Sequence, residues 1–257
     1  MRCIVIDVGN TSTTIARYVN GRIFRVTAIR GGIRKGPEQC VVAVNEALKS
    51  GVDGVIMASV VPAVNARWKT MIKRETGASL MLVTPDMKMD VKVDYPDPGT
   101  IGADRLANAC GGAYRYGAPL IVADFGTAVT FDIITRDAAY IGGVIAPGLP
   151  LMTDYLNDRT ALVPHVDLGG KVPPIGRSTV DAVRIGAQIG YRGMVREIVK
   201  YLQQSIGTDA NLVATGGYSR WVLKDSNMPF KMDPYLTLLG LGRLFDLNFQ
   251  ACKERCK

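Results

Sequence analysis

The stretch at residues 3–19, CIVIDVGNTSTTIARYV, returns in altered form at residues 120–134, LIVADFGTAVTFDII. Each copy is an apolar run that ends in an Asp-x-Gly turn and continues into a second β-rich run. A shift of 117 residues places Asp7 on Asp124. Because an internal repeat changes the prediction for the whole fold, these stretches indicate a chain built from two similar α/β lobes.

The residues after each turn extend the likeness. In the first half, Asn20 and Gly21 separate two β-rich runs, which is typical of a type I′ hairpin because both central residues need positive φ. A strand pattern followed by a helix pattern begins at residue 53 and again at residue 211. The alternative is a chance likeness between two strand-turn-strand units. We predict lobes at residues 1–115 and 116–257, with helices at about 37–50, 62–77, 102–116, 178–205 and 234–250.

The composition limits the classes of protein. The chain of 257 residues has 31 Lys and Arg against 23 Asp and Glu, a net charge of +8, which favours anionic partners such as nucleotides or nucleic acid. Its five cysteines are scattered without a C-x-x-C pair, and His165 is the single histidine. A zinc site, a disulfide framework and a Ser/His/Asp triad are therefore not indicated. No apolar run predicts a secretion signal or membrane span, and we expect a cytoplasmic protein.

The Asp-x-Gly turns are candidate phosphate-binding segments. Glycine lets a phosphate approach main-chain N–H groups, and a nearby aspartate can hold the accompanying cation. Taken singly, each turn is explained as the entry to a hairpin, but two in matching contexts favour a nucleotide site. The sequence contains neither a G-x-x-x-x-G-K-[ST] loop nor a G-x-G-x-x-G motif. The main evidence for assigning it to the P-loop or the dinucleotide-binding proteins is therefore missing.

Six motifs in this order resemble those of type III pantothenate kinases, of the acetate kinase, sugar kinase, Hsp70 and actin superfamily. They are DVGNT (7–11), SVVP (59–62), GADR (102–105), DFGTA (124–128), GGVIAPG (142–148) and TGG (215–217). The resemblance implies two ribonuclease H-like lobes of actin-like ATPase architecture, with mixed sheets flanked by helices. It also implies phosphorylation of pantothenate by ATP to 4'-phosphopantothenate, the first step of coenzyme A biosynthesis, in a homodimer that uses Mg²⁺ and either K⁺ or NH₄⁺.

The same resemblance implies a role for each matched residue. The first phosphate-binding turn comprises Asp7, Val8, Gly9, Asn10, Thr11, Ser12, Thr13 and Thr14, with Asp7 also near the magnesium ion. Thr127 contacts ATP, Asp124 helps to hold the monovalent cation, and Thr215, Gly216 and Gly217 lie by the adenosine. Pantothenate is bound by Tyr95, Gly102, Ala103, Asp104, Arg105 and Thr179, and Asp104 is the catalytic proton acceptor. The sequence departs from the family pattern at Thr14, where many members carry Lys, at Asp97 and at Ser178.

The chemistry of phosphoryl transfer fits these roles. It needs an acceptor hydroxyl in line with the γ-phosphate, cations to neutralise charge, and a carboxylate to receive the hydroxyl proton. Asp104 can be that carboxylate, or it can merely cap or salt-bridge its helix; Ser178 or Thr179 can likewise cap the helix that follows.

Two other functions stay open. One is a nucleotide-binding accessory or regulatory protein without turnover, and the other is a kinase of a different small alcohol. We do not expect nucleic acid as a partner, because the basic residues are dispersed and no helix-turn-helix, zinc finger or basic arm is recognisable.

Overall fold

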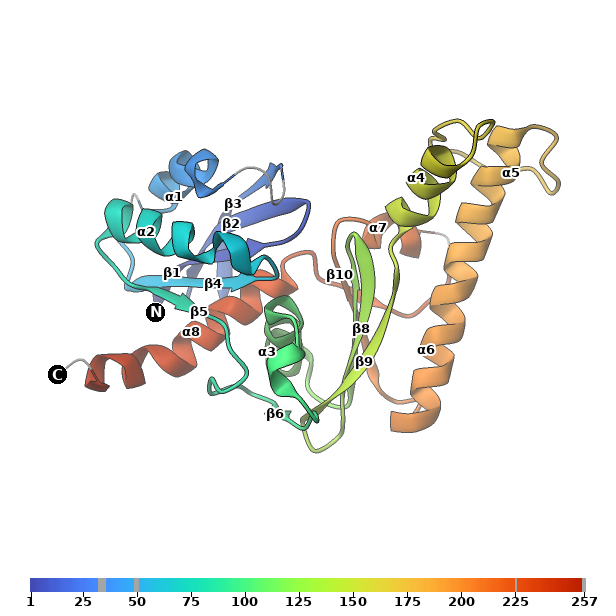
Figure 1. The fold of residues 1–257 in the computed structure, drawn as a ribbon. Helices are drawn as coiled ribbons and strands as arrows, with labels where there is room; N and C mark the ends of the chain where they lie inside the picture. Colours follow the sequence, from blue (N-terminus) through green and yellow to red (C-terminus); the bar gives the residue numbers. More distant parts are fainter. Residues whose placement is uncertain (32–35, 49–50, 225, 256–257) are drawn as a thin grey trace. The chain divides into compact units, whose positions relative to one another are not determined.

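The computed structural model describes residues 1–31, 36–48, 51–224 and 226–255 (Figure 1). Contacts divide the chain into two compact units. Unit 1 comprises Met1–Gly117, Ala138–Ile141 and Tyr235–Lys257, and unit 2 comprises Ala118–Asp137 and Gly142–Pro234.

Unit 1 contains a five-stranded mixed sheet in the order β3-β2-β1-β4-β5. The strands are β1 (Arg2–Val8), β2 (Ser12–Val19), β3 (Arg22–Arg30), β4 (Gly54–Ser59) and β5 (Leu80–Leu82). Asn20 and Gly21 join β2 to β3 with φ values of 45° and 82°, so the predicted positive-φ hairpin turn is confirmed. β1, β4 and β5 run parallel to one another, and β1 is antiparallel to β2.

Helices cover both faces of this sheet. Successive side chains of a strand point to opposite faces. Ile4 and Ile6 of β1 pack with Trp68 in one hydrophobic core, whereas a Cβ atom on Gly54, which pairs with Cys3, would meet Phe245 at 2.9 Å. The first face is thus covered by α1 and α2, and the second by α8. The helical elements are η2 (Pro37–Cys40), α1 (Val41–Leu48), η3 (Pro62–Val64), α2 (Asn65–Thr76), η4 (Pro98–Thr100), α3 (Ala103–Tyr116) and α8 (Leu236–Arg255).

The second sheet repeats the topology of the first. Its order is β11-β10-β7-β8-β9-β6, and reading from β9 to β11 reproduces the order of β3 to β5. The strands are β6 (Lys92–Val93), β7 (Leu120–Phe125), β8 (Ala128–Ile134), β9 (Ala139–Pro147), β10 (Asn211–Thr215) and β11 (Lys231–Met232). The α/β fold of two similar lobes inferred from the repeat is therefore confirmed, with β6 as an added edge strand.

In chain order, the helices of unit 2 come after β9 and before β11. They are α4 (Leu149–Arg159), α5 (Thr179–Ile185), the π-helical segment η5 (Gly186–Tyr191), α6 (Arg192–Ile206) and α7 (Ser219–Leu223). Residues 179–206 form one continuous helical run, as predicted for 178–205. Tyr191, Val195 and Leu202 of this run pack with Phe125 and Phe131 of the sheet in the core of the unit. The sequence did not predict α4, β5, β6 or β11.

The other predicted helices are present, and the prediction for residues 49–50 lies outside the described residues. Within the part of the chain that the structure describes, no helix is both long enough and apolar enough to cross a bilayer.

Candidate nucleotide and substrate site

The first phosphate-turn candidate joins β1 to β2. Its backbone is closed by Gly9, whose N–H donates to the carbonyl oxygen of Ser12 at 2.9 Å. A Cβ atom at Gly9 would lie only 3.2 Å from that oxygen, so the tight turn favours glycine. Asp7 is half-buried on β1, where it lies opposite Thr14 of β2 and beside Ala58 of β4. The strand pairing thus places the Asp7 carboxylate next to the turn.

The second turn has the same construction in unit 2, with one residue fewer. Four residues separate the paired Val8 and Thr13 in the first turn, but only three separate Phe125 and Val129 in the second. Gly126 donates its N–H to the carbonyl oxygen of Ala128 at 3.0 Å. The repeat seen in the sequence therefore corresponds to one structural device used twice.

Asp124 and the TGG segment (Thr215–Gly217) meet in unit 2. Asp124 on β7 pairs with Thr215 on the parallel strand β10. Gly216 has φ +88°, and a Cβ atom there would lie 2.5 Å from Oδ1 of Asp124 and 2.6 Å from the backbone of Phe125. Only glycine satisfies both the positive φ and this close approach. The structure thus brings together two segments that the sequence matched separately.

The backbone of Thr127 is held by a hydrogen bond from Gly148, for which the sequence predicted no role of its own. Gly148 donates its N–H to the carbonyl oxygen of Thr127 at 3.1 Å. A Cβ atom on Gly148 would lie 2.1 Å from the same oxygen, so any larger residue at position 148 would clash with the Thr127 backbone. Pro147-Gly148 ahead of a helix is a recognisable turn signal, but the sequence does not show which backbone it approaches.

Asp104 lies in the first turn of α3 and is half-buried. Its Oδ1 accepts the backbone N–H of Arg105 at 2.8 Å, and its carboxylate forms no ion pair with any described residue. Burial raises the pKa of Asp104, while the Arg105 N–H and guanidinium act in the opposite direction. A Cβ atom at Gly102 would lie 2.6 Å from Oδ1 of Asp104, so Gly102 leaves room for this carboxylate. Of the two structural alternatives for Asp104, the described chain shows no ion pair, whereas the hydrogen bond from the Arg105 N–H at the helix start is the kind of contact that the capping alternative expects.

Asp7 and Asp104 belong to the same edge of the unit 1 sheet. β1 and β4 are parallel and end together, with the N–H of Val60 donating to the carbonyl oxygen of Val8 at 3.1 Å. A Cβ atom at Gly102 would lie 3.6 Å from Cγ1 of Val60, so the start of α3 lies against the end of β4. The carboxyl ends of parallel strands are the usual position of binding sites in α/β sheets.

Tyr140 connects two of the predicted substrate residues. The Tyr95 and Tyr140 rings are 6.3 Å apart at 55°, and Cζ of Arg105 lies 5.9 Å from the centre of the Tyr140 ring. The Tyr140 carbonyl also accepts the N–H of Asp94 at 2.9 Å. Tyr95, Tyr140 and Arg105 therefore form one aromatic and cationic cluster. Sequence reasoning missed Tyr140, because its place depends on the pairing of β6 with β9.

Thr179 belongs to unit 2, whereas Tyr95, Tyr140 and Arg105 belong to unit 1. It is exposed at the first position of α5, and the cap is Ser178, whose Oγ accepts the N–H of Asp181 at 3.1 Å. Among the described elements, α5 has extensive contacts only with η5.

Oxygen donors in the two turns are chemically suited to hard cations. The Asp7 and Asp124 carboxylates are the ligand type that Mg²⁺ and K⁺ prefer, and Mg²⁺ is commonly held by one or two carboxylates together with substrate phosphates. No three His, Cys, Asp or Glu side chains gather into a metal cluster among the described residues. Each carboxylate would thus act with substrate oxygens or water rather than within a cage made only of side chains.

Two lobes with the same strand order and paired glycine turns define the fold class of actin-like ATPases and sugar kinases. A ROK family glucokinase from Streptomyces griseus, solved with glucose and AMPPNP, matches 97% of the chain and 100% of its own, with a TM-score of 0.55 and 15% identity. A Campylobacter jejuni protein titled a conserved putative Baf family transcriptional activator matches 96% of the chain and 99% of its own, with a TM-score of 0.62 and 16% identity. At these identities the likeness concerns the fold alone.

Sequence comparison gives the family. The family model of type III pantothenate kinase matches residues 3–201. A type III pantothenate kinase from Akkermansia muciniphila is 44% identical over 196 residues, which cover 76% of this chain and 79% of that protein. The chain belongs to the type III pantothenate kinase family, and the family implies ATP and a divalent metal ion.

Proposed function

We propose that this protein transfers the γ-phosphoryl group of ATP to the hydroxyl of pantothenate, giving 4'-phosphopantothenate in the first step of coenzyme A biosynthesis. Family membership supports the reaction. The observation that carries the proposal in the structure is the half-buried Asp104 carboxylate, held at the same sheet edge as the turn that follows Asp7.

Asp104 is the proposed proton acceptor. Phosphoryl transfer requires that the attacking hydroxyl lose its proton, and a carboxylate within hydrogen-bond reach can receive it. Burial raises the pKa of Asp104, which makes its ionised form a better base than an exposed aspartate. The Arg105 N–H, which donates to Oδ1, orients the carboxylate and leaves Oδ2 for the hydroxyl.

The two turns are the proposed phosphate and nucleotide contacts. The segment Asp7 to Thr14 presents backbone N–H groups and hydroxyls to phosphate oxygens, and Thr127 and the TGG segment contact ATP in unit 2. Bound Mg²⁺ and a monovalent cation, K⁺ or NH₄⁺, would neutralise phosphate charge, with Asp7 and Asp124 as their protein ligands. The glycines at positions 9, 126 and 216 keep these surfaces free of side chains.

The aromatic and cationic cluster is the proposed pantothenate contact. Arg105 offers a planar set of donors to the pantothenate carboxylate, and Tyr95 offers an amphipathic ring, with Tyr140 supporting both. Gly102 and Ala103 provide the start of α3, where backbone N–H groups face the substrate. Thr179 is proposed to reach the substrate from a second copy of the chain.

A homodimer is supported by exposed apolar side chains of unit 2, several of them on α4 and η5, which contact each other. They lie on α4, on the chain that follows it and on the run from α5 to η5, and they are Leu151, Tyr155, Leu156, Leu162, Ile175 and Ile189. Contiguous exposed apolar surface is typical of a protein interface. We also propose a cytoplasmic location, since the described cysteines Cys3, Cys40 and Cys110 are free thiols.

The lobe assignment also remains a proposal. We propose actin-like lobes at residues 1–115 and 116–257, with the final helix α8 returning to pack on α3 and the first sheet. The repeated strand order supports two lobes of common construction.

The function is tested by offering a panel of acceptors. Purified protein with ATP, Mg²⁺ and K⁺ should convert pantothenate to a product 80 Da heavier, about the mass of one phosphoryl group on a single hydroxyl. Small hydroxy acids and sugars serve as competing acceptors, and Na⁺ replaces K⁺ in a parallel reaction. Preferential phosphorylation of another alcohol would replace pantothenate as the substrate.

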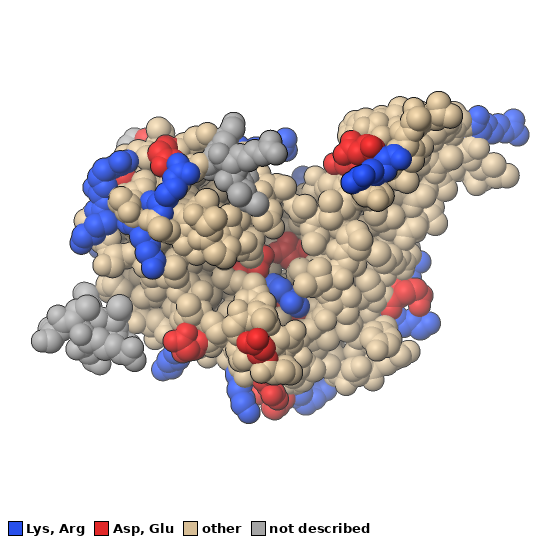
Figure 2. Space-filling view, viewed as in Figure 1, with Lys and Arg blue, Asp and Glu red and all other residues tan. Residues whose placement is uncertain are grey.

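The non-enzymatic alternative predicts a different result. An accessory protein would bind duplex DNA in a salt-dependent manner and would not turn over ATP. Lys and Arg on the face in Figure 2 lie in separate groups, several of them beside Asp or Glu, rather than in one continuous basic surface. This distribution favours the kinase.

A further inference from the structure

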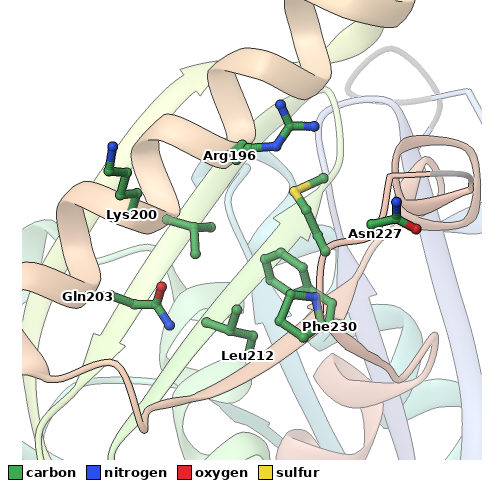
Figure 3. Close-up of a pocket in the computed structure, with 9 residues that line it drawn as sticks. Arg196, Lys200, Gln203, Leu212, Asn227 and Phe230 are labelled. Carbon is green, nitrogen blue, oxygen red and sulfur yellow. The ribbon is translucent and has the colours of Figure 1, made fainter.

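A small pocket in unit 2 is lined by residues to which no role has been assigned above. It is formed between α6 and the chain that leads from α7 to β11, and it has a volume of about 190 Å³ (Figure 3). Its lining is Arg196, Val199, Lys200, Gln203, Leu212, Asn227, Met228, Pro229 and Phe230. None of these residues belongs to the two turns, the TGG segment or the Tyr95 cluster.

The pocket combines an apolar floor with a polar rim. Val199 and Leu212 belong to the core of the unit, with Met228 and Phe230 packed against it. Figure 3 shows Arg196, Lys200 and Gln203 along the helix that borders these apolar side chains, with the Lys200 amine directed away from Leu212 and Phe230. Asn227 lies on the segment opposite. An apolar cavity of about 150 Å³ suffices to bind benzene, so this volume fits one aromatic ring.

Two cations at the rim have no counter-ion in the described chain. Arg196 and Lys200 are four residues apart on α6 and both are exposed. Neither forms an ion pair or a hydrogen bond with another described residue. Like charges at i and i+4 on a helix destabilise each other, and an anion bound near them would reduce that repulsion. The rim therefore favours a negatively charged group on the ligand.

The wall opposite α6 is preformed. The Phe230 ring packs edge-on against Phe125 at 6.3 Å and 75°, and the N–H of Phe230 donates to the carbonyl oxygen of Met228 at 2.9 Å. The next residue, Lys231, pairs with Val213 in the sheet. These contacts hold Phe230 in place without a ligand, so a ligand would meet an already formed wall there, which favours binding.

We propose that this pocket binds a small aromatic carboxylate, with its ring on the Leu212 and Phe230 floor and its carboxylate at the rim formed by α6, where Arg196 and Lys200 supply positive charge. The site is independent of the proposed kinase activity. Gln203 and Asn227 supply amide groups at the rim for further polar contacts with the same ligand class.

The probe is phenylacetate, titrated into full-length protein with ¹⁵N and methyl NMR as the readout. We expect saturable shifts at Leu212, Met228 and Phe230, and binding about five- to tenfold weaker for phenylacetamide, which has the same shape without the charge. The variant R196Q/K200Q should lose affinity for phenylacetate by the same factor. It should keep normal pantothenate kinase turnover.

The control variant is K171Q/R177Q, which removes two exposed charges elsewhere in unit 2 and should bind phenylacetate as the parent does. Equal binding of phenylacetate and phenylacetamide, or equal loss in both double variants, would overturn the proposal. Absence of saturable shifts at the floor residues would also overturn it, as would displacement of phenylacetate by an ATP analogue.

Discussion

The close packing of α3 on α8 makes Gly240→Ala the most informative test of the fold of unit 1. A Cβ atom at Gly240 would lie 1.8 Å from the carbonyl oxygen of Ala107 and 2.6 Å from its carbonyl carbon. Gly111 contributes from the other side, since a Cβ there would meet the backbone of Gly240 at 2.9 Å. Thr237 donates a hydrogen bond to Asn108 at 2.7 Å beside this contact. The two helices are therefore in backbone contact through their glycines.

Two opposing effects set the change in unfolding free energy that Gly240→Ala should cause. Ordinary contacts need about 3.5 Å, so the added methyl group is more than 1.5 Å too close to backbone that cannot rotate away. Overpacking of this kind costs up to about 3 kcal/mol, while alanine gains about 1 kcal/mol of helix propensity over glycine. The expected net loss of unfolding free energy is about 2 kcal/mol, which lowers the urea midpoint by about 0.7–2 M.

The assay isolates unit 1. The chain has two tryptophans, and Trp68 lies buried in unit 1 whereas Trp221 lies in unit 2. In a Trp221→Phe background, the fluorescence of Trp68 reports the urea unfolding of unit 1 alone. The matched control is Gly193→Ala in α6, where a Cβ atom would have nothing within 4 Å.

The control should be neutral or more stable by up to about 1 kcal/mol, read from Trp221 in a Trp68→Phe background. If Gly240→Ala also raises or preserves the midpoint, α3 and α8 do not pack through these glycines, and the reasoning about the position of Asp104 on α3 fails.

Three further predictions concern the proposed site. Gly216→Ala places a Cβ atom at positive φ against the Asp124 carboxylate, so KM for ATP should rise at least about tenfold. In the control Gly217→Ala the added Cβ atom has nothing within 4 Å, so KM for ATP should stay within about twofold of the parent value. Equal effects of the two changes would show that the close approach of Gly216 to Asp124 does not matter for ATP binding. Burial raises the pKa of Asp104, so the stability that this group contributes is fully present below its unfolded pKa and is lost as pH rises through the folded value. Asp104→Asn should therefore gain stability relative to the parent as the pH rises above about 4, the unfolded value of an aspartate. Urea midpoints that differ by the same amount at every pH would contradict the burial. Ser178→Ala removes the cap of α5 and should lower the free energy of unfolding by about 1 kcal/mol, measured by thermal or urea unfolding. Thr179→Ala should raise KM for pantothenate and leave the free energy of unfolding unchanged. The reverse pattern would assign the two residues the opposite roles.

The duplicated fold was readable from the sequence because its determinants are local. The Asp-x-Gly turns and the Asn20-Gly21 hairpin need particular residues at particular positions, and they mark the order of strands in both halves. The strands β5, β6 and β11 have two or three residues each, too few for any periodicity to appear. Helix α4 was missed because apolar residues such as Leu151 and Leu156 are exposed and give no clear buried stripe.

The site was only partly readable for a related reason. The matched segments could be named from their motifs, but the sequence could not show which segments touch. Tyr140 enters the cluster because β6 pairs with β9, and Gly148 acts through a backbone approach to Thr127. Both contacts join segments that are distant in the sequence, so neither could be predicted from the type of residue alone.

The most direct test of the account is the turnover of Asp104→Asn measured beside Asp94→Asn. Both changes remove one carboxylate from unit 1, and Asp94 is exposed. If Asp104 receives the hydroxyl proton, its variant should lose about 10²- to 10⁴-fold in kcat for 4'-phosphopantothenate formation while KM for ATP changes little, and Asp94→Asn should stay near the parent. An Asp104→Asn protein that turns over at the parent rate would contradict the account.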